Sequence, residues 1–317
     1  MEWCNWSFTP LQKGFGQTTS QASAFSPCNI TGFFRIHDSA RDPLRVGSTG
    51  VGVALDIGVT TMVSLRRTRH PRIVATFNGD QLTTKSVSIE VARRYCELDG
   101  RSWHIQVSHE SGVPSGLGYG TSGAGALSLS LALNEAMGLS LSLPEAAQLA
   151  HLCEVECQTG LGTVTSVFSG GLSVRTEPGA PEIGQVKKIL LPSSISIVSA
   201  SFGPISTQRV LSDNHLKKTI NACGRALTQT FLLDASHSNF MTLSRIFSNC
   251  VGLMSSRLRR VMSDLDLSGF ICSMMMLGES LFCLIPREDV ARVEAILRSH
   301  LLAPTTSAIA RSGAHLI

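Results

Sequence analysis

Apolar residues recur along the chain with two spacings, which predict a mixture of strands and helices. The segments 30–36, 51–65, 72–77 and 103–108 are rich in β-branched and other large apolar residues, and these indicate strands. Between the last two of them, residues 86–98 have the spacing of an amphipathic helix. The first third of the chain is therefore expected to form a sheet with at least one covering helix.

The segment 114–128, which follows the fourth of these strands, is dense in glycine and hydroxyl residues. It reads PSGLGYGTSGAGALS, with five glycines, and continues through LSLSLAL and NEAM to Gly138. The alternation of Leu and Ser is typical of a strand. We nevertheless predict a helix, because the apolar run goes on as NEAM and stops at a glycine, a good residue for a helix end.

A glycine-rich turn that leads into a helix is suited to binding phosphate. Glycine lets the main chain approach a ligand without a Cβ in the way, and the first N–H groups of the helix favour an anion. The spacing is neither the Walker motif, which needs Gly-Lys-Ser/Thr, nor the dinucleotide fingerprint in its usual place. On the residues alone, a phosphate-binding loop and a surface loop before a core helix both remain open.

A second helix is expected from Ser142, since Glu145 three residues later completes a capping box. We expect this helix to run to a stop near Gly160. Its spacing places a polar stripe on one face of an otherwise apolar helix, formed by His151, Glu154 and Gln158. The stripe faces either solvent or the glycine-rich loop.

The remainder of the chain predicts further strands and helices without regular alternation. Residues 163–171 and 172–178 are expected to form the two arms of a hairpin, and 178–184 is the best linker candidate. Beyond the linker we predict a strand at 193–202, helices at 216–232 and 238–265, two strands around Gly278 within 270–286, and a last helix after Pro286. This order indicates an α+β fold.

Composition narrows the function classes. The 317 residues are 43% hydrophobic and 16% charged, with a net charge of +4, which is typical of a globular protein with real cores. The basic clusters at 66–72 and 257–260 are short and lack aromatic neighbours, so we expect no nucleic-acid partner. No apolar run is long enough to span a membrane, and the first residues do not resemble a signal peptide. We therefore expect a cytoplasmic protein with no membrane partner, whose nine cysteines are buried thiols.

Five motifs in order along the chain resemble the GHMP small-molecule kinases, a group that includes galactose, homoserine and mevalonate kinases. They are AFSPCNITGFF, DPLRVGSTGVGV, PSGLGYGTSGAGALS, AHLCEVECQTGLGTV and MMMLGESLFCL. Within the group, the archaeal pantoate kinases are most similar. The resemblance implies a domain similar to the second domain of ribosomal protein S5, followed by a ferredoxin-like domain. It also implies ATP-dependent phosphorylation of (R)-pantoate to (R)-4-phosphopantoate, a step toward coenzyme A.

The resemblance also implies roles for particular residues. The nucleotide would be bound by Pro114, Gly116, Gly118, Gly120, Thr121, Ser122, Gly123 and Ala124. Ser122 and Glu154 would hold Mg²⁺, for which hydroxyl and carboxylate oxygens are suitable ligands. The substrate, which carries a carboxylate, would be held by Ser48, His151 and Arg175, with Arg45 as a further candidate.

Two departures from the pattern leave alternatives open. Relatives usually carry Pro-Gly-His where this chain has Pro27, Cys28 and Asn29, and an aspartate where this chain has Thr163. If that aspartate is the general base, it is absent here, although Thr163 remains a candidate catalytic position. A kinase for another small hydroxy acid or alcohol, and a catalytically weak ATP-binding regulator, are therefore alternatives to a pantoate kinase.

The expected domain limits follow the same pattern. We predict an N-terminal extension at 1–22, an ATP-binding domain at 23–184 and a C-terminal domain at 185–317. The sequence does not decide the oligomeric state, for which a homodimer is one candidate.

Overall fold

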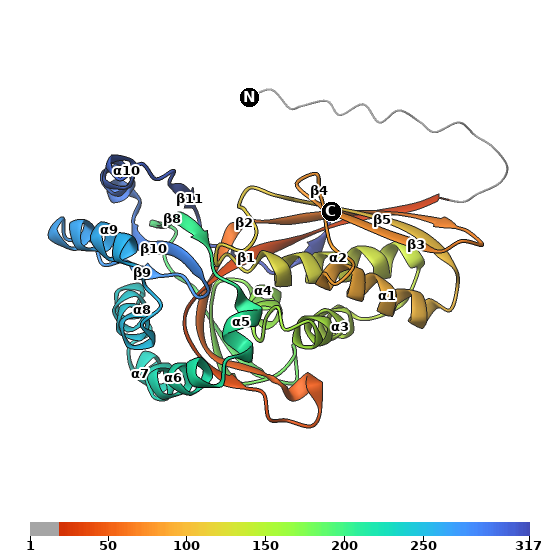
Figure 1. The fold of residues 1–317 in the computed structure, drawn as a ribbon, viewed down its shortest axis with the longest axis horizontal. Coiled ribbons are helices and arrows are strands. Elements are labelled where there is room, and N and C mark those ends of the chain that lie inside the picture. The colour runs from red at the N-terminus through yellow and green to blue at the C-terminus, as the bar shows by residue number, and fades with distance from the viewer. Residues whose placement is uncertain (1–18) are drawn as a thin grey trace.

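The computed structural model describes residues 19–317 and contains two β-sheets, each covered by helices (Figure 1). The larger sheet has the strand order β12-β1-β2-β5-β3-β4, and β6 and β7 extend it beside one end of β2. Its strands are β1 (Thr19–His37), β2 (Gly47–Arg67), β3 (Arg72–Phe77), β4 (Asp80–Gln81), β5 (Trp103–Ser111), β6 (Leu172–Glu177), β7 (Gln185–Ile189) and β12 (His315–Leu316).

The second sheet is antiparallel and has the order β11-β8-β10-β9. Its strands are β8 (Ile195–Pro204), β9 (Ser273–Met274), β10 (Gly278–Pro286) and β11 (Thr305–Ser307). The helices are α1 (Val87–Asp99), α2 (Thr121–Met137), α3 (Leu143–Glu156), α4 (Thr163–Ser169), α5 (Thr207–Ser212), α6 (Asn214–Gly224), α7 (Leu227–Leu233), α8 (His237–Val251), α9 (Ser256–Leu267) and α10 (Val290–Ser299), with short 3-10 helices at Pro43–Arg45 and Arg287–Asp289.

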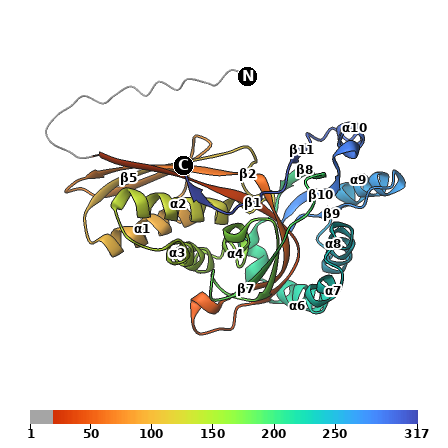
Figure 2. The same ribbon diagram turned by 180° about the vertical axis from the view of Figure 1, so that it is seen from behind.

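β1 and β2 form a long antiparallel pair that connects the two halves of the molecule. Both strands bend away from the larger sheet toward α6 and α8 (Figures 1 and 2), and the bend coincides with register shifts after Pro27 and Thr31. Gly50 of β2 permits this close pairing, because a Cβ there would lie only 2.3 Å from the Phe33 carbonyl oxygen and its φ is +144°. A glycine at position 50 is therefore required where the two strands pair closely.

α1 and α2 cover one face of the larger sheet, as Figure 1 shows, and α2 is buried on almost all sides. This burial explains its misleading alternation of Leu and Ser. Ser128 Oγ donates to the Ala124 carbonyl within the helix, and Ser130 Oγ donates to the Ala146 carbonyl of α3. The serines are thus satisfied inside the core, and the prediction of a helix is confirmed.

Most predicted elements are confirmed, including the strands at β1, β2, β3, β5, β8 and β10 and the helices α1 and α10. The capping box of Ser142 and Glu145 is present at the start of α3. The end of α3 was predicted too late: the helix stops at Glu156, and Gln158 has a left-handed backbone with φ of +55°. Gln158 therefore does not continue the polar stripe of the helix.

The expected hairpin of residues 163–171 and 172–178 is wrong. The first arm is the helix α4, which begins after Gly162 and ends at Gly170, and the second arm is β6, which pairs with β7. The β-branched residues of α4 favour a strand, but tertiary contacts prevail, such as the bond from Thr165 Oγ1 to the Gly179 carbonyl at 2.9 Å. Residues 178–184 consequently connect two strands of one sheet, so they are not a link between the two sheets.

Each of the two long helices expected in the C-terminal half is broken into two. The first divides after Gly224, where a Cβ would lie 2.2 Å from the Phe34 carbonyl oxygen, so a glycine is needed for α6 to approach β1. The second divides at Gly252, which ends α8 with a left-handed φ of +73°. A glycine thus lies at both breaks, and Gly252 ends its helix through its backbone conformation.

The cysteines depart from the expectation that all are buried thiols. Cys223 of α6 and Cys250 of α8 form a disulfide, and Cys96 and Cys157 are only partly buried.

No helix within residues 19–317 has the length and apolar character needed to cross a membrane. The expected extension at 1–22 lies outside the described residues except for its last four, which begin β1. The domain limits stay a prediction.

Candidate active site

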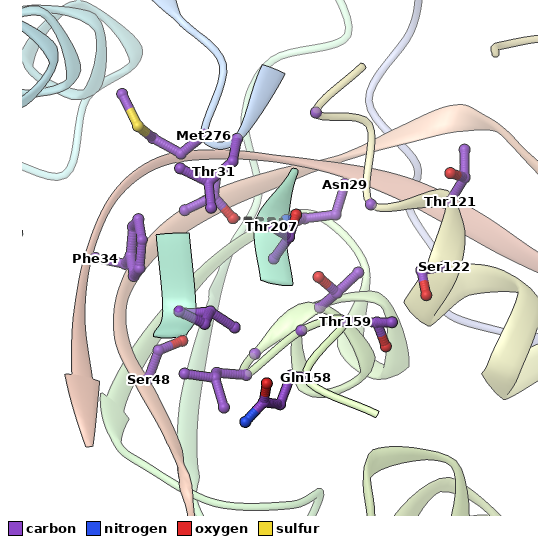
Figure 3. A pocket seen from close by; sticks show the side chains of 18 of the residues that line it. Asn29, Thr31, Phe34, Ser48, Thr121, Ser122, Gln158, Thr159, Thr207 and Met276 are labelled. Carbon is purple, nitrogen blue, oxygen red and sulfur yellow. Dashed lines mark hydrogen bonds between the residues drawn. The ribbon is translucent and has the colours of Figure 1, made fainter. Parts of the chain in front are cut away.

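The larger sheet, the loop before α2, the segment 158–163, α5 and the connection between β9 and β10 surround a cavity of about 330 Å³ (Figure 3). Elements far apart in sequence contribute to it, and no single segment could form it alone. The lining residues are Asn29, Thr31, Phe34, Ser48, Ser115, Gly116, Gly118, Gly120, Thr121, Ser122, Gln158, Thr159, Gly160, Leu161, Gly162, Thr163, Arg175, Thr207, Gln208, Leu211, Met276 and Leu277.

The glycine-rich loop lies between β5 and α2, in the strand–loop–helix context that a phosphate site requires. Gly116, Gly118 and Gly120 all have positive φ, and Gly120 is the residue before the first turn of α2. A Cβ on Gly120 would lie 2.7 Å from Thr163 Cγ2. No side chain caps the first N–H groups of α2, so these donors are available to an anion in the cavity.

Five of the eight residues assigned to the nucleotide line the cavity, namely Gly116, Gly118, Gly120, Thr121 and Ser122. The other three do not. Pro114 is exposed, and Ala124 is fully buried in the core. Gly123 packs against residues of the site, because the space beside its Cα is filled by Glu154 and Thr163.

Glu154 extends from α3 to the start of α2 and is only 2% exposed. Its Oε1 accepts a hydrogen bond from Thr159 at 3.3 Å, and the Ser122 hydroxyl also bonds to the carboxyl group. Burial raises the pKa of Glu154 to about 7, against the smaller lowering by these two hydrogen bonds. No basic side chain of the described residues forms an ion pair with it. A buried carboxylate beside a hydroxyl, with no cation, suits a hard metal ion such as Mg²⁺.

Thr163 is the first residue of α4 and faces the glycine-rich loop. A Cβ on Gly123 would lie 2.8 Å from Thr163 Cβ and 2.6 Å from Glu154 Oε2, so these two side chains are neighbours. A Cβ on Gly160 would lie 2.7 Å from Glu154 Oε2, so the segment before α4 packs against this carboxyl group and Thr163 lies at the same end of the cavity as Ser122 and Glu154.

Arg175 of β6 lies on another wall of the cavity together with Ser48 of β2. The guanidinium is 2% exposed; one Nη donates to Ser166 Oγ, while Nε has no partner. Burial lowers the pKa of Arg175 to about 10, so it still carries its charge at neutral pH. No acidic side chain of the described residues pairs with it, and a cation in this position favours an anion in the cavity.

Two other predicted substrate residues do not line the cavity. His151 is buried in α3, and its Nε2 donates to the Val46 carbonyl at 2.9 Å; burial lowers its pKa. It therefore contacts the chain two residues before Ser48. Arg45 is 69% exposed in its side chain and lies 3.8 Å from Asp42.

Several lining residues were not singled out from the sequence as site residues. Asn29, noted only as a departure from the family pattern, is 1% exposed and faces the cavity. Gly160 and Gly162, which flank Leu161, carried a signal in the spacing of the TGLG motif. Thr207 and Leu277 carried no such signal in the sequence, because they reach the cavity only through the packing of the second sheet.

Comparison with known proteins places this geometry in a family. The GHMP kinases N terminal domain matches residues 85–171, which span α1 to the start of β6. The pantoate kinase of Thermococcus kodakarensis is 33% identical over 278 residues, covering 86% of this chain and 91% of the relative. The pantoate kinase of Methanocaldococcus jannaschii is 31% identical, covering 88% of this chain and 98% of the relative.

Solved structures agree with the sequence relatives. A phosphotransferase related to the CoA biosynthesis pathway superimposes with a TM-score of 0.85 at 29% identity, covering 94% of this chain and 98% of the other. A homoserine kinase from Cytophaga hutchinsonii shares the fold, with a TM-score of 0.69 at 16% identity and coverage of 99% and 100%. The fold is therefore the α+β GHMP kinase fold, and the chain belongs to the pantoate kinase family of the GHMP kinases.

Proposed function

We propose that this protein transfers the γ-phosphoryl group of ATP to the 4-hydroxyl of (R)-pantoate, giving (R)-4-phosphopantoate. The observation that carries the proposal is the cavity itself. At one end it presents the free N–H groups of α2 and a buried carboxylate, and on another wall a buried arginine without an acidic partner. A molecule with a carboxylate and a hydroxyl can be held at the arginine while its hydroxyl meets a bound triphosphate.

At the loop end, the main-chain N–H groups of Gly118 to Ser122 would bind the phosphates of ATP, as donors at a helix start do. Ser122 and Glu154 would hold Mg²⁺, and the ion when bound would neutralise phosphate charge. Their oxygens suit this cation, and among residues 19–317 there is no cluster of three His, Cys, Asp or Glu side chains that would suit a different metal site.

On the substrate side, Arg175 would bind the carboxylate and Ser48 would add a hydroxyl contact. A charge-assisted bond of this kind stabilises a complex by about 1.5–3 kcal/mol. His151 would act on the substrate only through the main chain, because its Nε2 holds the Val46 carbonyl and so fixes the start of β2. A direct contact from Arg45 stays a prediction.

The residues of this site serve the reaction mainly by positioning the two substrates. Phosphoryl transfer depends mainly on aligning the acceptor hydroxyl and on stabilising charge, and both tasks are served by the donors named above. Thr163 lies next to Ser122 and Glu154 but cannot take a proton at neutral pH. It can orient the acceptor hydroxyl by hydrogen bonding.

The test is an assay of ADP release with purified protein, ATP and Mg²⁺ and a panel of pantoate, mevalonate, homoserine and shikimate. We expect turnover that needs both pantoate and Mg²⁺. Turnover with another member but none with pantoate would contradict the proposal. Binding of ATP without turnover on any member would favour a regulatory protein, a function for which Thr163 in place of the usual aspartate is the supporting observation.

A further inference from the structure

Asn29 combines burial with an unused hydrogen-bond acceptor on the wall of the cavity. Its side chain is 1% exposed, and its Nδ2 donates to Thr31 Oγ1 at 3.2 Å, as Figure 3 shows, while its Oδ1 has no partner. Buried amide oxygens without a partner are rare in folded proteins. Since Asn29 lines the cavity, a ligand there is the source from which Oδ1 can gain a donor.

The main chain holds this amide in place. The Asn29 N–H donates to the Tyr119 carbonyl at 2.8 Å, and a Cβ on Gly120 would lie 3.1 Å from the Asn29 carbonyl oxygen, so β1 is fixed to the glycine-rich loop. On its other side the amide packs over Gly52 of β2, where a Cβ would lie 2.9 Å from Nδ2 and 3.0 Å from Oδ1. The side chain has little freedom to turn away from the cavity.

β2 places Asn29 and Arg175 on one face of the sheet. Ser48, Gly50 and Gly52 alternate along the strand and therefore point to the same side. Arg175 pairs with Gly50 across β2 and β6, and the Asn29 amide covers Gly52, two residues or about 7 Å further along the strand. A short hydroxy acid bound by its carboxylate at Arg175 therefore lies on the same face of the sheet as the Asn29 amide.

We propose that Asn29 is a specificity-determining residue, whose Oδ1 accepts a hydrogen bond from the substrate hydroxyl that is not phosphorylated. The inference rests on the proposed function and names the 2-hydroxyl of pantoate. The 4-hydroxyl is the poorer partner, because it must lose its proton during transfer, and a neutral amide oxygen would hold that proton in place. An acid without the 2-hydroxyl would leave Oδ1 unsatisfied, so the site rejects it.

The experiment compares pantoate with its 2-deoxy analogue, 4-hydroxy-3,3-dimethylbutanoate, in the wild-type protein and in Asn29→Ala. We expect the wild type to prefer pantoate in kcat/KM by at least about tenfold, since an unmade bond to a buried group is costly. In Asn29→Ala the preference should fall to within about threefold, because pantoate loses affinity and the analogue does not. An unchanged preference in Asn29→Ala overturns the proposal.

Arg175→Ala is the matched control. Both compounds carry the carboxylate, so this variant should weaken both by the same factor and keep the preference of the wild type. Melting temperatures identify a variant that has not folded, and Asn29→Leu, which keeps the number and branching of the side-chain heavy atoms and removes the oxygen, replaces Asn29→Ala if the latter unfolds.

Calorimetric titration of both compounds in the presence of a non-hydrolysable ATP analogue separates this inference from the proposed function. A wild type that releases no ADP but binds pantoate in preference to the analogue, with this preference lost in Asn29→Ala, contradicts the kinase and supports the role of Asn29. A wild type that turns over both compounds equally supports the kinase and contradicts the role of Asn29.

Discussion

Two groups of buried polar side chains lie along the first half of α2, and they differ in whether their partners are present. In the first, His109 of β5 bonds through Nδ1 to Thr61 Oγ1 at 2.7 Å and through Nε2 to Ser88 Oγ at 2.9 Å. In the second, the cavity, Asn29 Oδ1 and Arg175 Nε have no partner, and Glu154 has no cation. The first group therefore stabilises the fold, whereas the second leaves its interactions to ligands.

The comparison indicates how burial can be interpreted. Both groups are shielded from water, and burial lowers the pKa of His109 to about 4 as it raises that of Glu154 to about 7. Burial alone does not separate structural from functional residues. What separates these two groups is the unpaired charges and the missing hydrogen-bond partners of the cavity, because such groups are costly to bury unless a ligand supplies the partner.

The largest expected effect is in the cavity. Glu154→Gln should lower turnover by about 10²–10³-fold, because the amide cannot replace a charged oxygen whose contacts strengthen as charge develops. ADP release measures turnover. The melting temperature shows whether the fold is retained, as we expect. Glu156→Gln, on the same helix but paired with Arg94 at the surface, is the control and should keep the wild-type rate. Equal rates for Glu154→Gln and the wild type would remove the metal assignment.

A carboxylate added beside Glu154 tests whether the site can use a general base. Thr163→Asp should raise turnover by about 10²-fold, the low end for a positioned base, because Glu154 is its neighbour and the two carboxylates disfavour one another. The rate should fall at acidic pH as the new carboxylate is protonated, which a pH profile of kcat detects. Thr163→Asn, which has the same shape without a basic oxygen, should show no gain. A fall in turnover with unchanged substrate binding would mean that no base is used at this position.

Removal of the unpaired cation should affect one substrate only. Arg175→Ala should weaken pantoate by about 1.5–3 kcal/mol, or roughly 10–150-fold in KM, and leave the KM of ATP unchanged. Steady-state kinetics with each substrate varied in turn makes the measurement. An effect confined to ATP would reassign Arg175 to the nucleotide.

The smallest expected effect on activity comes from the satisfied group. His109→Ala should lower the free energy of unfolding by about 1–3 kcal/mol at pH 7, because Thr61 and Ser88 lose their partner, with kcat and KM unchanged. The pKa of His109 is about 4 in the fold, where burial favours the neutral ring, against 6.5 for an unperturbed histidine. Its contribution is therefore complete above pH 6.5 and is lost as the pH falls toward 4.

Urea unfolding at pH 7 and pH 5 tests whether the free energy of unfolding falls at the lower pH, as expected. The wild type should lose about 2 kcal/mol between the two pH values through His109, and His109→Ala should not, so the difference between them shrinks at pH 5. A change in kcat in the folded variant would show that this group also serves the reaction, and the distinction between the two groups would fail.

The sequence was sufficient for the fold class and for the strand–loop–helix around the glycines, while the convergence of Ser122, Glu154 and Thr163 near that loop was implied by the order of the family motifs. These are local features or ordered motifs: a capping box, a glycine spacing and a hydrophobic run act over a few residues. The helical state of α2 was also predictable, from its continuation and its terminal glycine.

Which residues face the cavity, and which of them lack partners, depends on the packing of distant segments. α4 is a helix despite its β-branched residues because it packs between other elements, and His151 is turned toward Val46 instead of the substrate space. Asn29 and Arg175 are 146 residues apart in sequence and share one wall because β2 lies between their strands. Contacts of this kind depend on the packing of distant segments, which no local pattern encodes.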